Sequence, residues 1–211
     1  MYIGRSGLSY AKRLKPLQPA RSRGKKAAVP GALALIVRRH NVMPASPDDL
    51  FAFLDQIGIA HTTVTHPPLF TVEQSQALRG TIAGGHTKNL FVKDKKDKVF
   101  LLVVPEDAVI ELKSMHKLLG ASGRFSFASA ALMQELLGVE PGSVTPFGVI
   151  NDKEARVNVV LDSAMMANGI LNYHPLVNTM TTSIASRDLV TFLKATGHDP
   201  RIEALSAGSG G

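Results

Sequence analysis

The chain has 211 residues, 45% of them hydrophobic, which fits one domain of ordinary size together with an appendage. It contains no cysteine, so disulfides, thiolate catalysis and cysteine-based zinc sites are excluded. The net charge is +7, but ten Lys or Arg and no acid fall within residues 1–42, which leaves residues 43–211 at about −3. A domain of this charge is not expected to hold a long stretch of nucleic acid by charge alone, although it could bind one tip.

The first predicted element is a helix that begins near Ser46. The Ser46 side chain can cap the helix, Pro47 suits its first position, and two aspartates follow at the positive end of the helix dipole. Apolar side chains then recur at helical spacing up to Gly58. The β-branched run 61–65 predicts a short strand, and a second helix is expected from Thr71 through about residue 78.

Two apolar runs, 84–92 and 99–104, flank a charged turn and predict a β-hairpin. The turn, 93–98, alternates four lysines with two aspartates, and we expect it to be solvated, with contact to a nucleic acid as the alternative. Lys88 lies at the mouth of the first strand, where a buried ammonium would need a partner or water. It is therefore either a solvated lysine at a strand end or part of a site built there.

The middle of the chain mixes helical and strand patterns. Residues 106–119 predict a helix whose inward face is formed by Val109, Leu112, Met115 (or His116) and Leu119. Residues 124–128 alternate like a strand. A further helix is expected from a cap at Ser129 to a stop at Gly138.

Strand patterns dominate the last third of the chain. Three strands are expected after a loop at 142–146, and Asn168-Gly169 is a strong turn signal for a hairpin between the last two. These three strands are predicted at 147–151, 156–162 and 170–174.

A further strand is predicted at 180–184, before a final helix that starts at Ser186 or Asp188. The inward side chains of that helix are expected to be Leu189, Phe192 and Leu193. Because the strands are mostly joined as hairpins with helices interspersed, the expected fold class is α+β, with a mixed, largely antiparallel sheet surrounded by helices.

Four segments stand in an order that is similar to a known family. They are Thr87-Lys88-Asn89, the Gly-x-x-x-Pro loop at 142–146, the strand at 157–162, and residues 172–181 with their Tyr-His-Pro sequence. In this order they resemble the prolyl-tRNA editing domain family, also called YbaK-like, and within it the free-standing alanyl-specific editing proteins. The resemblance covers about residues 43–205.

The resemblance implies a catalytic role for Lys88, which matches the essential lysine of the family and could hold ester or phosphate oxygens as a cationic donor. The 142–146 loop matches one whose backbone amides lie close to the aminoacyl group, and His174 is the candidate for shaping the amino-acid pocket. The substrate-binding residues that the resemblance implies are Thr87, Asn89, Gly142, Ser143, Pro146 and His174.

Each of these residues also has a plainer interpretation. Asn89 follows Lys88 in a strand and therefore points to the opposite face, unless the strand bends or ends there. Asn89 could simply bond backbone, the 142–146 loop could be a plain connection, and His174 could be structural. No histidine pair has metal-ligand spacing, so we expect neither a metal nor another cofactor.

By resemblance, the expected activity is hydrolysis of the ester in mischarged tRNA(Pro), with Ala-tRNA(Pro) as the leading substrate and prolyl-tRNA synthetase as a possible partner. Such an ester is already activated, so a positioned water and a hydrogen-bonded carbonyl suffice. Two alternatives stay open. One is removal of cysteine or another small residue from the same tRNA, and the other is a non-catalytic module that binds an RNA end or a protein.

Residues 1–42 are expected to form a disordered basic leader, followed by the editing domain at 43–205 and a flexible tail at 206–211. The leader fits an organelle transit peptide, a tRNA-binding arm, or translation from an upstream start with Met43 as the natural beginning. The lack of cysteine suits a cytoplasmic location. No apolar run reaches the roughly 18 residues that cross a bilayer, so no membrane partner is expected.

Overall fold

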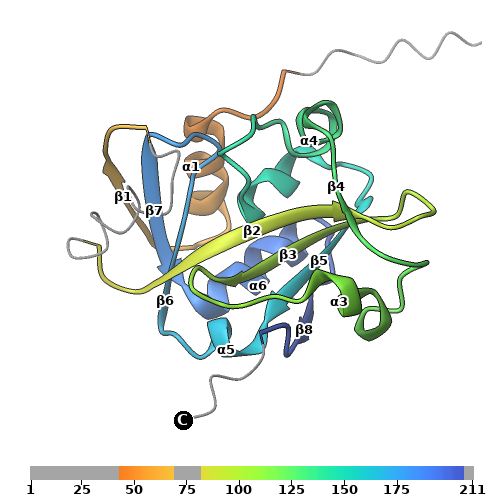
Figure 1. Ribbon diagram of the computed structural model, residues 1–211. Helices are drawn as coiled ribbons and strands as arrows, with labels where there is room; N and C mark the ends of the chain where they lie inside the picture. Colours follow the sequence, from red (N-terminus) through yellow and green to blue (C-terminus); the bar gives the residue numbers. More distant parts are fainter. Residues whose placement is uncertain (1–42, 69–81, 207–211) are drawn as a thin grey trace, which may run out of the picture. The chain divides into compact units, whose positions relative to one another are not determined.

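The computed structural model describes residues 43–68 and 82–206 (Figure 1). These residues contain an eight-stranded sheet in the order β1-β7-β6-β2-β3-β5-β8, with β4 beside β2. The elements in chain order are α1 (Pro47–Gln56), β1 (His61–Thr65), β2 (Gly85–Lys93), β3 (Val99–Pro105), α3 (Leu112–Leu118), β4 (Ser126–Phe127), α4 (Ala130–Leu137), η1 (Pro146–Asn151), β5 (Val157–Asp162), α5 (Ser163–Met166), β6 (Ile170–Tyr173), β7 (Met180–Ala185), α6 (Ser186–Ala195) and β8 (Arg201–Glu203).

Strand pairing in the sheet is mixed. The pairs β1–β7, β6–β7, β2–β3 and β2–β4 are antiparallel. The pairs β2–β6, β3–β5 and β5–β8 are parallel. β2 belongs to both halves of the sheet, because its first residues pair with β6 and its whole length beyond them pairs with β3. The predicted class, α+β with a mixed, largely antiparallel sheet and surrounding helices, is confirmed.

Helices cover both faces of the sheet and enclose two apolar cores. In β3, Leu101 and Val103 point into the first core, which also receives side chains of α1, α4, η1 and α6. Phe100 and Leu102 point into the second core, which α3 covers through Met115. Figure 1 shows α3 on one side of β3, with α6 and α1 on the other. This alternation fixes the face on which each β2 side chain lies.

The helix starts that local sequence predicts are confirmed at α1 and α4. Ser46 accepts a hydrogen bond from the Asp49 amide, and the Asp49 side chain accepts one from the Ser46 amide, which completes a capping box. The Ser129 side chain caps α4 by accepting from the Leu132 amide, without the reciprocal bond, because Leu132 has no side-chain acceptor. Gly138 ends α4 at a φ of 65°, a left-handed conformation that glycine adopts without steric cost.

The prediction of a helix from residue 106 was wrong, because α3 begins only at Leu112. Residues 106–111 form an irregular segment, in which Val109 is 81% exposed rather than facing inward. The backbone groups that would start a helix are used elsewhere. The Glu106 amide donates to the His86 carbonyl of β2, and the Ala108 carbonyl accepts from the Lys88 ammonium.

The expected strand at 147–151 is instead the 3₁₀ helix η1. Pro146 occupies its first turn, and the Thr145 side chain caps it by accepting from the Phe147 amide over 3.3 Å. A short run of apolar residues that is buried all round does not distinguish a strand from a helix by its periodicity. The cap and the proline decide the matter here.

The expected hairpin between the strands at 156–162 and 170–174 does not form. β5 pairs with β3 and β8, whereas β6 pairs with β7 and β2, so the two strands lie in different halves of the sheet. Helix α5 lies between them in the chain and is capped by Asp162, whose side chain accepts from the amides of Ala164 and Met165. Asn168-Gly169 therefore turns from α5 into β6.

Two smaller differences concern short strands. The predicted strand at 124–128 is reduced to the two residues of β4, which pair only with the last residues of β2. β8 was not predicted, because three residues are too short to show a periodic pattern. Ser206, the first residue of the predicted tail, is held by hydrogen bonds to Asp162. The predicted leader, the helix from Thr71 and the tail beyond Ser206 lie outside the described residues.

Candidate functional site

The start of β2 is the place where the two halves of the sheet part. The first residues of β2 pair in parallel with β6, and Thr87 Oγ1 donates to the Asn172 carbonyl over 3.2 Å. Gly85 permits this close approach, because a Cβ there would lie 2.9 Å from the Asn168 side chain. After Thr87, β2 continues beside β3, and β4 joins it only at Val92 and Lys93. The two residues that follow, Lys88 and Asn89, therefore lie where β6 no longer covers the edge of β2.

Asn89 connects this edge to the 142–146 loop. Its Nδ2 donates a hydrogen bond to the Val144 carbonyl over 2.9 Å. Because a carbonyl can only accept, the amide must turn its nitrogen to Val144 and its oxygen away. The Asn89 Oδ1 is buried and has no hydrogen-bond partner within the described part of the chain. A buried acceptor without a partner is costly and is suited to a ligand that brings a donor.

The 142–146 loop is packed into the domain rather than standing free. Ser143 and Thr145 are buried, as is Pro146 at the start of η1. Gly142 has a φ of +91°, a conformation that L side chains rarely adopt, so glycine is required for this backbone. The loop therefore has a defined shape, fixed at one end by glycine and at the other by proline.

Lys88 makes a different contact from its neighbour. Its Nζ donates to the Ala108 carbonyl over 2.5 Å, and its side chain is half-buried. By strand alternation it lies on the face of Leu90, toward the second core, whereas Asn89 lies on the opposite face, toward the first. An ammonium has three N–H donors, so the Ala108 carbonyl leaves two of them for other groups.

His174 follows the end of β6, and its Nδ1 donates to the Met180 carbonyl over 3.0 Å. The carbonyl fixes the tautomer, so the Nε2 of the neutral ring is a hydrogen-bond acceptor. Burial lowers the pKa of His174 below its usual value, and the nearby His66 lowers it further. The hydrogen bond to Met180 and the charge of Glu106 act in the opposite direction without reversing this shift. His174 is therefore neutral at pH 7.

A second histidine, which the sequence did not single out, lies beside His174. The His66 ring centre is 6.3 Å from that of His174. His66 is buried, with Nδ1 bonded to the Pro67 carbonyl at 2.8 Å and Nε2 to Thr181 Oγ1 at 2.9 Å. The two rings thus hold the start of β7 from two positions.

A network of neutral polar side chains joins β6 to its neighbours. Asn172 Nδ2 donates to the Ala83 carbonyl over 3.2 Å, and Asn172 Oδ1 accepts from Ser183 Oγ over 2.6 Å. Thr182 is fully buried and bonds Thr63 of β1 at 2.9 Å. The sequence shows only that β6 and β7 contain Asn172, Thr181, Thr182 and Ser183, and it does not indicate which partners they bond.

The structure brings some of the predicted site residues together and leaves Lys88 apart from them. Asn89 contacts the loop at Val144, and the Gly142 backbone faces Asn178, whose Nδ2 lies 3.9 Å from the position of a Cβ on Gly142. The loop therefore adjoins both β2 and the segment that follows His174. The hydrogen bonds of the described residues do not link Lys88 to the loop or to His174.

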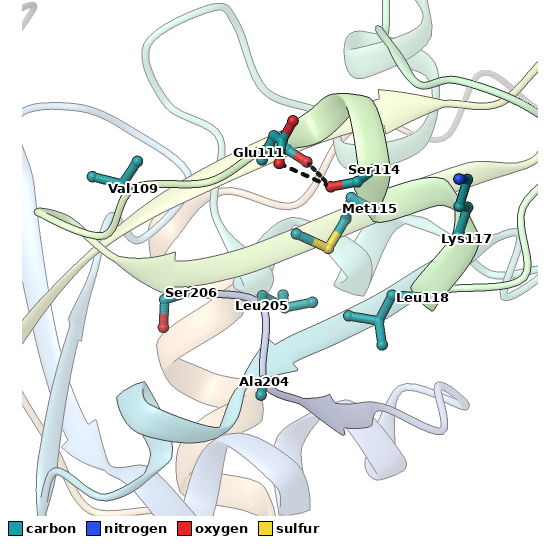
Figure 2. A pocket seen from close by; sticks show the side chains of 9 residues that line it. All are labelled: Val109, Glu111, Ser114, Met115, Lys117, Leu118, Ala204, Leu205 and Ser206. Atoms are coloured by element: carbon teal, nitrogen blue, oxygen red, sulfur yellow. Dashed lines mark hydrogen bonds between the residues drawn. The ribbon is translucent and has the colours of Figure 1, made fainter. Parts of the chain in front are cut away.

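Two hollows lie near these elements. One, of about 230 Å³, borders the start of β2 and is lined by Gly85, His86, Pro105, Glu106, Asp107 and Asn168. A wider one, of about 750 Å³, lies between α3 and the C-terminal residues 204–206 (Figure 2). In Figure 2, Met115 and Leu205 face each other across the wider hollow, and its lining includes none of the predicted site residues.

Neither a metal cluster nor a membrane span is found in residues 43–68 and 82–206. No three His, Asp or Glu side chains of this part of the chain lie close enough together to hold a metal ion. The helices described here are also too short and too polar to cross a bilayer.

Comparison with protein families and sequences gives consistent matches. The profile of the aminoacyl-tRNA editing domain matches residues 66–192, a range that contains every predicted site residue. The chain is 41% identical over 162 residues to prolyl-tRNA synthetase associated domain-containing protein 1 of Bos taurus, covering 73% of this chain and 94% of that protein. It is 33% identical over 150 residues to the prolyl-tRNA editing protein ProX of Acetoanaerobium sticklandii, covering 71% and 91%.

A solved structure has the same fold. It is a crystal structure assigned provisionally as a trans-editing enzyme for prolyl-tRNA synthetase, with a TM-score of 0.60 and 18% identity. The match covers 78% of this chain and 99% of that one. At this identity the likeness concerns the arrangement of strands and helices alone.

Proposed function

This chain belongs to the aminoacyl-tRNA editing domain family, and we propose that it is a trans-editing deacylase that hydrolyses the ester of alanine mischarged onto tRNA(Pro). The observation that carries the proposal is the junction at the start of β2. There Asn89 is bonded to the 142–146 loop and keeps a buried acceptor free, directly after Lys88 with its two remaining donors. Donors and acceptors of this kind are what an ester, its amino group and a water molecule need.

The chemistry follows from the side chains at that edge. As water attacks the ester, negative charge develops on its carbonyl oxygen. A fixed cationic donor such as Lys88 stabilises that charge in the transition state. The Asn89 Oδ1 and the His174 Nε2 are acceptors, suited to the α-ammonium of the amino acid, a ribose hydroxyl or the attacking water. Because β6 ends beside Lys88 and Asn89, a ligand seated at this edge of β2 lies within reach of both faces.

The hydrogen-bond partner of Lys88 supports an enzyme over a non-catalytic binding module. If a lysine is paired with a carboxylate, its charge is neutralised in a structural ion pair. Lys88 Nζ instead donates to a neutral backbone carbonyl. Exchange of such a bond for one to a developing oxyanion is favourable, because hydrogen bonds between charged groups are about twice as strong as neutral ones.

Selectivity for alanine would come from exclusion. By this proposal, the amino-acid side chain is held against the packed 142–146 loop, where the proline ring would be rejected by its size, whereas attraction alone separates apolar groups of similar size only weakly. The same site would admit cysteine, so cysteine is the second substrate to compare. By this proposal the partner is the acceptor end of tRNA(Pro), and the protein supports prolyl-tRNA synthetase by removing what that enzyme misacylates.

The test is a deacylation assay with purified protein and three substrates: Ala-tRNA(Pro), Cys-tRNA(Pro) and Pro-tRNA(Pro). We expect Ala-tRNA(Pro) to be hydrolysed at least about tenfold faster than Pro-tRNA(Pro), a ratio that corresponds to roughly 1.4 kcal/mol. Faster release of cysteine than of alanine would reassign the substrate while keeping the enzyme class. If all three esters survive at their uncatalysed rates, the protein is not a deacylase of tRNA(Pro).

A further inference from the structure

The far end of β2 carries an exposed cluster of basic side chains and one aromatic ring. Figure 1 shows β2 crossing the domain from the site to the β2–β3 turn at the opposite end. The turn docks on residues 121–125, since the Lys95 amide donates to the Ser122 carbonyl and the Lys95 stem packs on Gly123. We name this surface the basic end; its members are Lys95, Lys96, Lys98, Arg124 and Phe127, all of them exposed.

One acid of this turn is buried, and the other is paired with a lysine. The carboxylate of Asp94 is buried and accepts hydrogen bonds from the amides of Lys96, Lys98 and Ser122 at 2.8 to 3.0 Å. Asp97 is exposed but paired with Lys93 at 2.6 Å. The turn 93–98 keeps a net charge of +2 and Arg124 adds a third positive charge, although residues 43–211 as a whole carry about −3. The positive charge is therefore local to this end.

The aromatic ring distinguishes this surface from a merely solvated lysine turn. Phe127 is 65% exposed on β4, where it pairs with Val92 of β2, next to the lysines. Beside the exposed cations, this ring offers a flat apolar face that the described residues leave open to a ligand. Cations that contact phosphates, combined with an aromatic ring on which an unpaired base can stack, are the usual means of holding RNA ends.

The distance between the basic end and the site suits an RNA arm that lies along β2. A strand rises about 3.3 Å per residue, so the turn beyond Lys93 lies about 20 Å from Lys88. Each strand of a DNA duplex carries one phosphate for about every 3.4 Å of helix axis, so a distance of this order spans several nucleotides. An RNA whose 3′ end reached the start of β2 would therefore place phosphates of its stem at the basic end.

We propose that the basic end is the surface that binds the phosphate backbone of the tRNA acceptor stem, with Phe127 stacking on an unpaired base. This inference rests on the proposed function, because it takes tRNA as the substrate. It also explains how a domain with a net negative charge binds RNA: the three or four contacts that orient the arm are gathered in one place.

The test compares two triple variants of the full chain that lose the same charge. One is Lys95→Ala/Lys96→Ala/Lys98→Ala, and the control is Lys117→Ala/Lys153→Ala/Lys194→Ala, which removes exposed lysines elsewhere. The probe is an RNA hairpin that carries no amino acid. It has the acceptor-stem sequence and an unpaired 3′ end, and its binding is measured at several salt concentrations. Both variants keep residues 1–42, so any contribution of that segment cancels.

We expect the basic-end variant to bind the hairpin at least about tenfold more weakly at low salt. The slope of log K against log salt should become shallower by about 2 to 3, the range for three lost phosphate contacts. The control should change affinity less than about twofold. Equal losses in the two variants, or no loss in the first, would overturn the proposal. If the triple variant melts early, Lys96→Glu replaces it, and unchanged hairpin affinity would overturn the proposal equally.

Phe127→Ala tests the stacking contact separately. It should weaken hairpin binding by roughly fivefold or more without changing the salt slope, because stacking releases no counterions. Unchanged affinity would show that Phe127 takes no part in RNA binding by the basic end. Deacylation is read in parallel: a raised KM for mischarged tRNA with unchanged kcat agrees with the proposal, and an unchanged KM contradicts it. If no ester is hydrolysed but hairpin binding still separates the two triples, the proposed function falls and the RNA surface stands.

Discussion

The two halves of the sheet are stabilised by different physics. Apart from Pro105, Asn158 and Asp162, the side chains of β3 and β5 are Val, Leu and Phe, and all of these are buried. β1, β6 and β7 instead bury Thr181, Thr182 and Asn172, each of which needs its own hydrogen-bond partner. Apolar burial is non-directional, whereas a buried polar group demands one geometry. The aliphatic half therefore gives stability, and the polar half gives a fixed position to the edge of β2 where the candidate site lies.

The largest expected effect is in the aliphatic half. Leu101→Ala removes a fully buried side chain from β3 and should lower the free energy of unfolding by about 2–5 kcal/mol, measured by urea denaturation. Deacylation per folded molecule should stay unchanged, because Leu101 makes no contact at the site. Val64→Ala, on the exposed side of β1, is the control and should cost less than about 1 kcal/mol. A loss of less than about 1 kcal/mol for Leu101→Ala would mean that the first core is less tightly packed than the full burial of Leu101 implies.

The aliphatic half also depends on one carboxylate, Asp162. Its two oxygens accept five hydrogen bonds, from the amides of Ala164, Met165, Leu205 and Ser206 and from the Ser206 hydroxyl. Burial alone would raise the pKa of Asp162, but these hydrogen bonds outweigh it and lower the pKa. A lowered pKa in the folded state means that the carboxylate stabilises the fold above the unfolded value of about 3.9, and that this contribution is lost as the pH falls through that value toward the folded one.

Asp162→Asn should therefore reduce stability by about 1–3 kcal/mol at pH 7, because the neutral amide cannot accept all five hydrogen bonds. Its melting temperature should fall less steeply than that of the wild type below about pH 4. Asp152, whose pKa is also lowered, by hydrogen bonds from His198 and backbone amides against the effect of burial, keeps part of the acid sensitivity in both proteins. Parallel acid melting curves for the two proteins would contradict this assignment.

Asn172→Ala applies the same measurement to the polar half. It leaves the Ser183 hydroxyl and the Ala83 carbonyl without their partner, which should cost about 1–3 kcal/mol of stability. Unlike Leu101→Ala, it should also lower deacylation per folded molecule, because the Ala83 contact holds the chain that leads into β2. Ser183→Ala is the milder control. If Asn172→Ala behaves like a core variant, with stability lost and activity kept, the contrast between the halves fails.

The smallest expected effect on stability comes with a selective effect on activity. Lys88→Ala should lower turnover of mischarged tRNA by at least about tenfold, roughly 1.4 kcal/mol, with little change in melting temperature. Lys113→Ala is a matched surface control. His174→Ala should instead weaken substrate binding or blur the choice of amino acid, because its role by this proposal is to shape the pocket. Near-full activity of Lys88→Ala beside inactive His174→Ala at unchanged stability would reverse the two roles.

The candidate site was partly accessible from sequence. Lys88 at a strand end and the 142–146 loop stand out because a lysine, a glycine and a proline each carry a local conformational or chemical signal. The roles of these residues stay predictions, and what the structure adds is their placement. It joins Asn89 to Val144 and turns Lys88 to the opposite face, toward Ala108. His66 and Thr182 gave no such signal, because a polar residue in a strand is meaningful only once its partner on another strand is known.

Local sequence by itself determined the elements whose signals are complete within a few residues. The capping box of α1, the serine and glycine at the ends of α4, and the charged turn between β2 and β3 are of this kind. Only the tertiary structure decided which strands pair, since the β-pattern of residues 157–162 is the same whether the strand joins β6 in a hairpin or lies between β3 and β8. Asp162 separates those outcomes by capping α5 and holding Leu205 and Ser206, contacts up to 44 residues apart in the chain. The open edge of β2 at Lys88 and Asn89 is likewise a tertiary feature, since it depends on where the pairing with β6 ends.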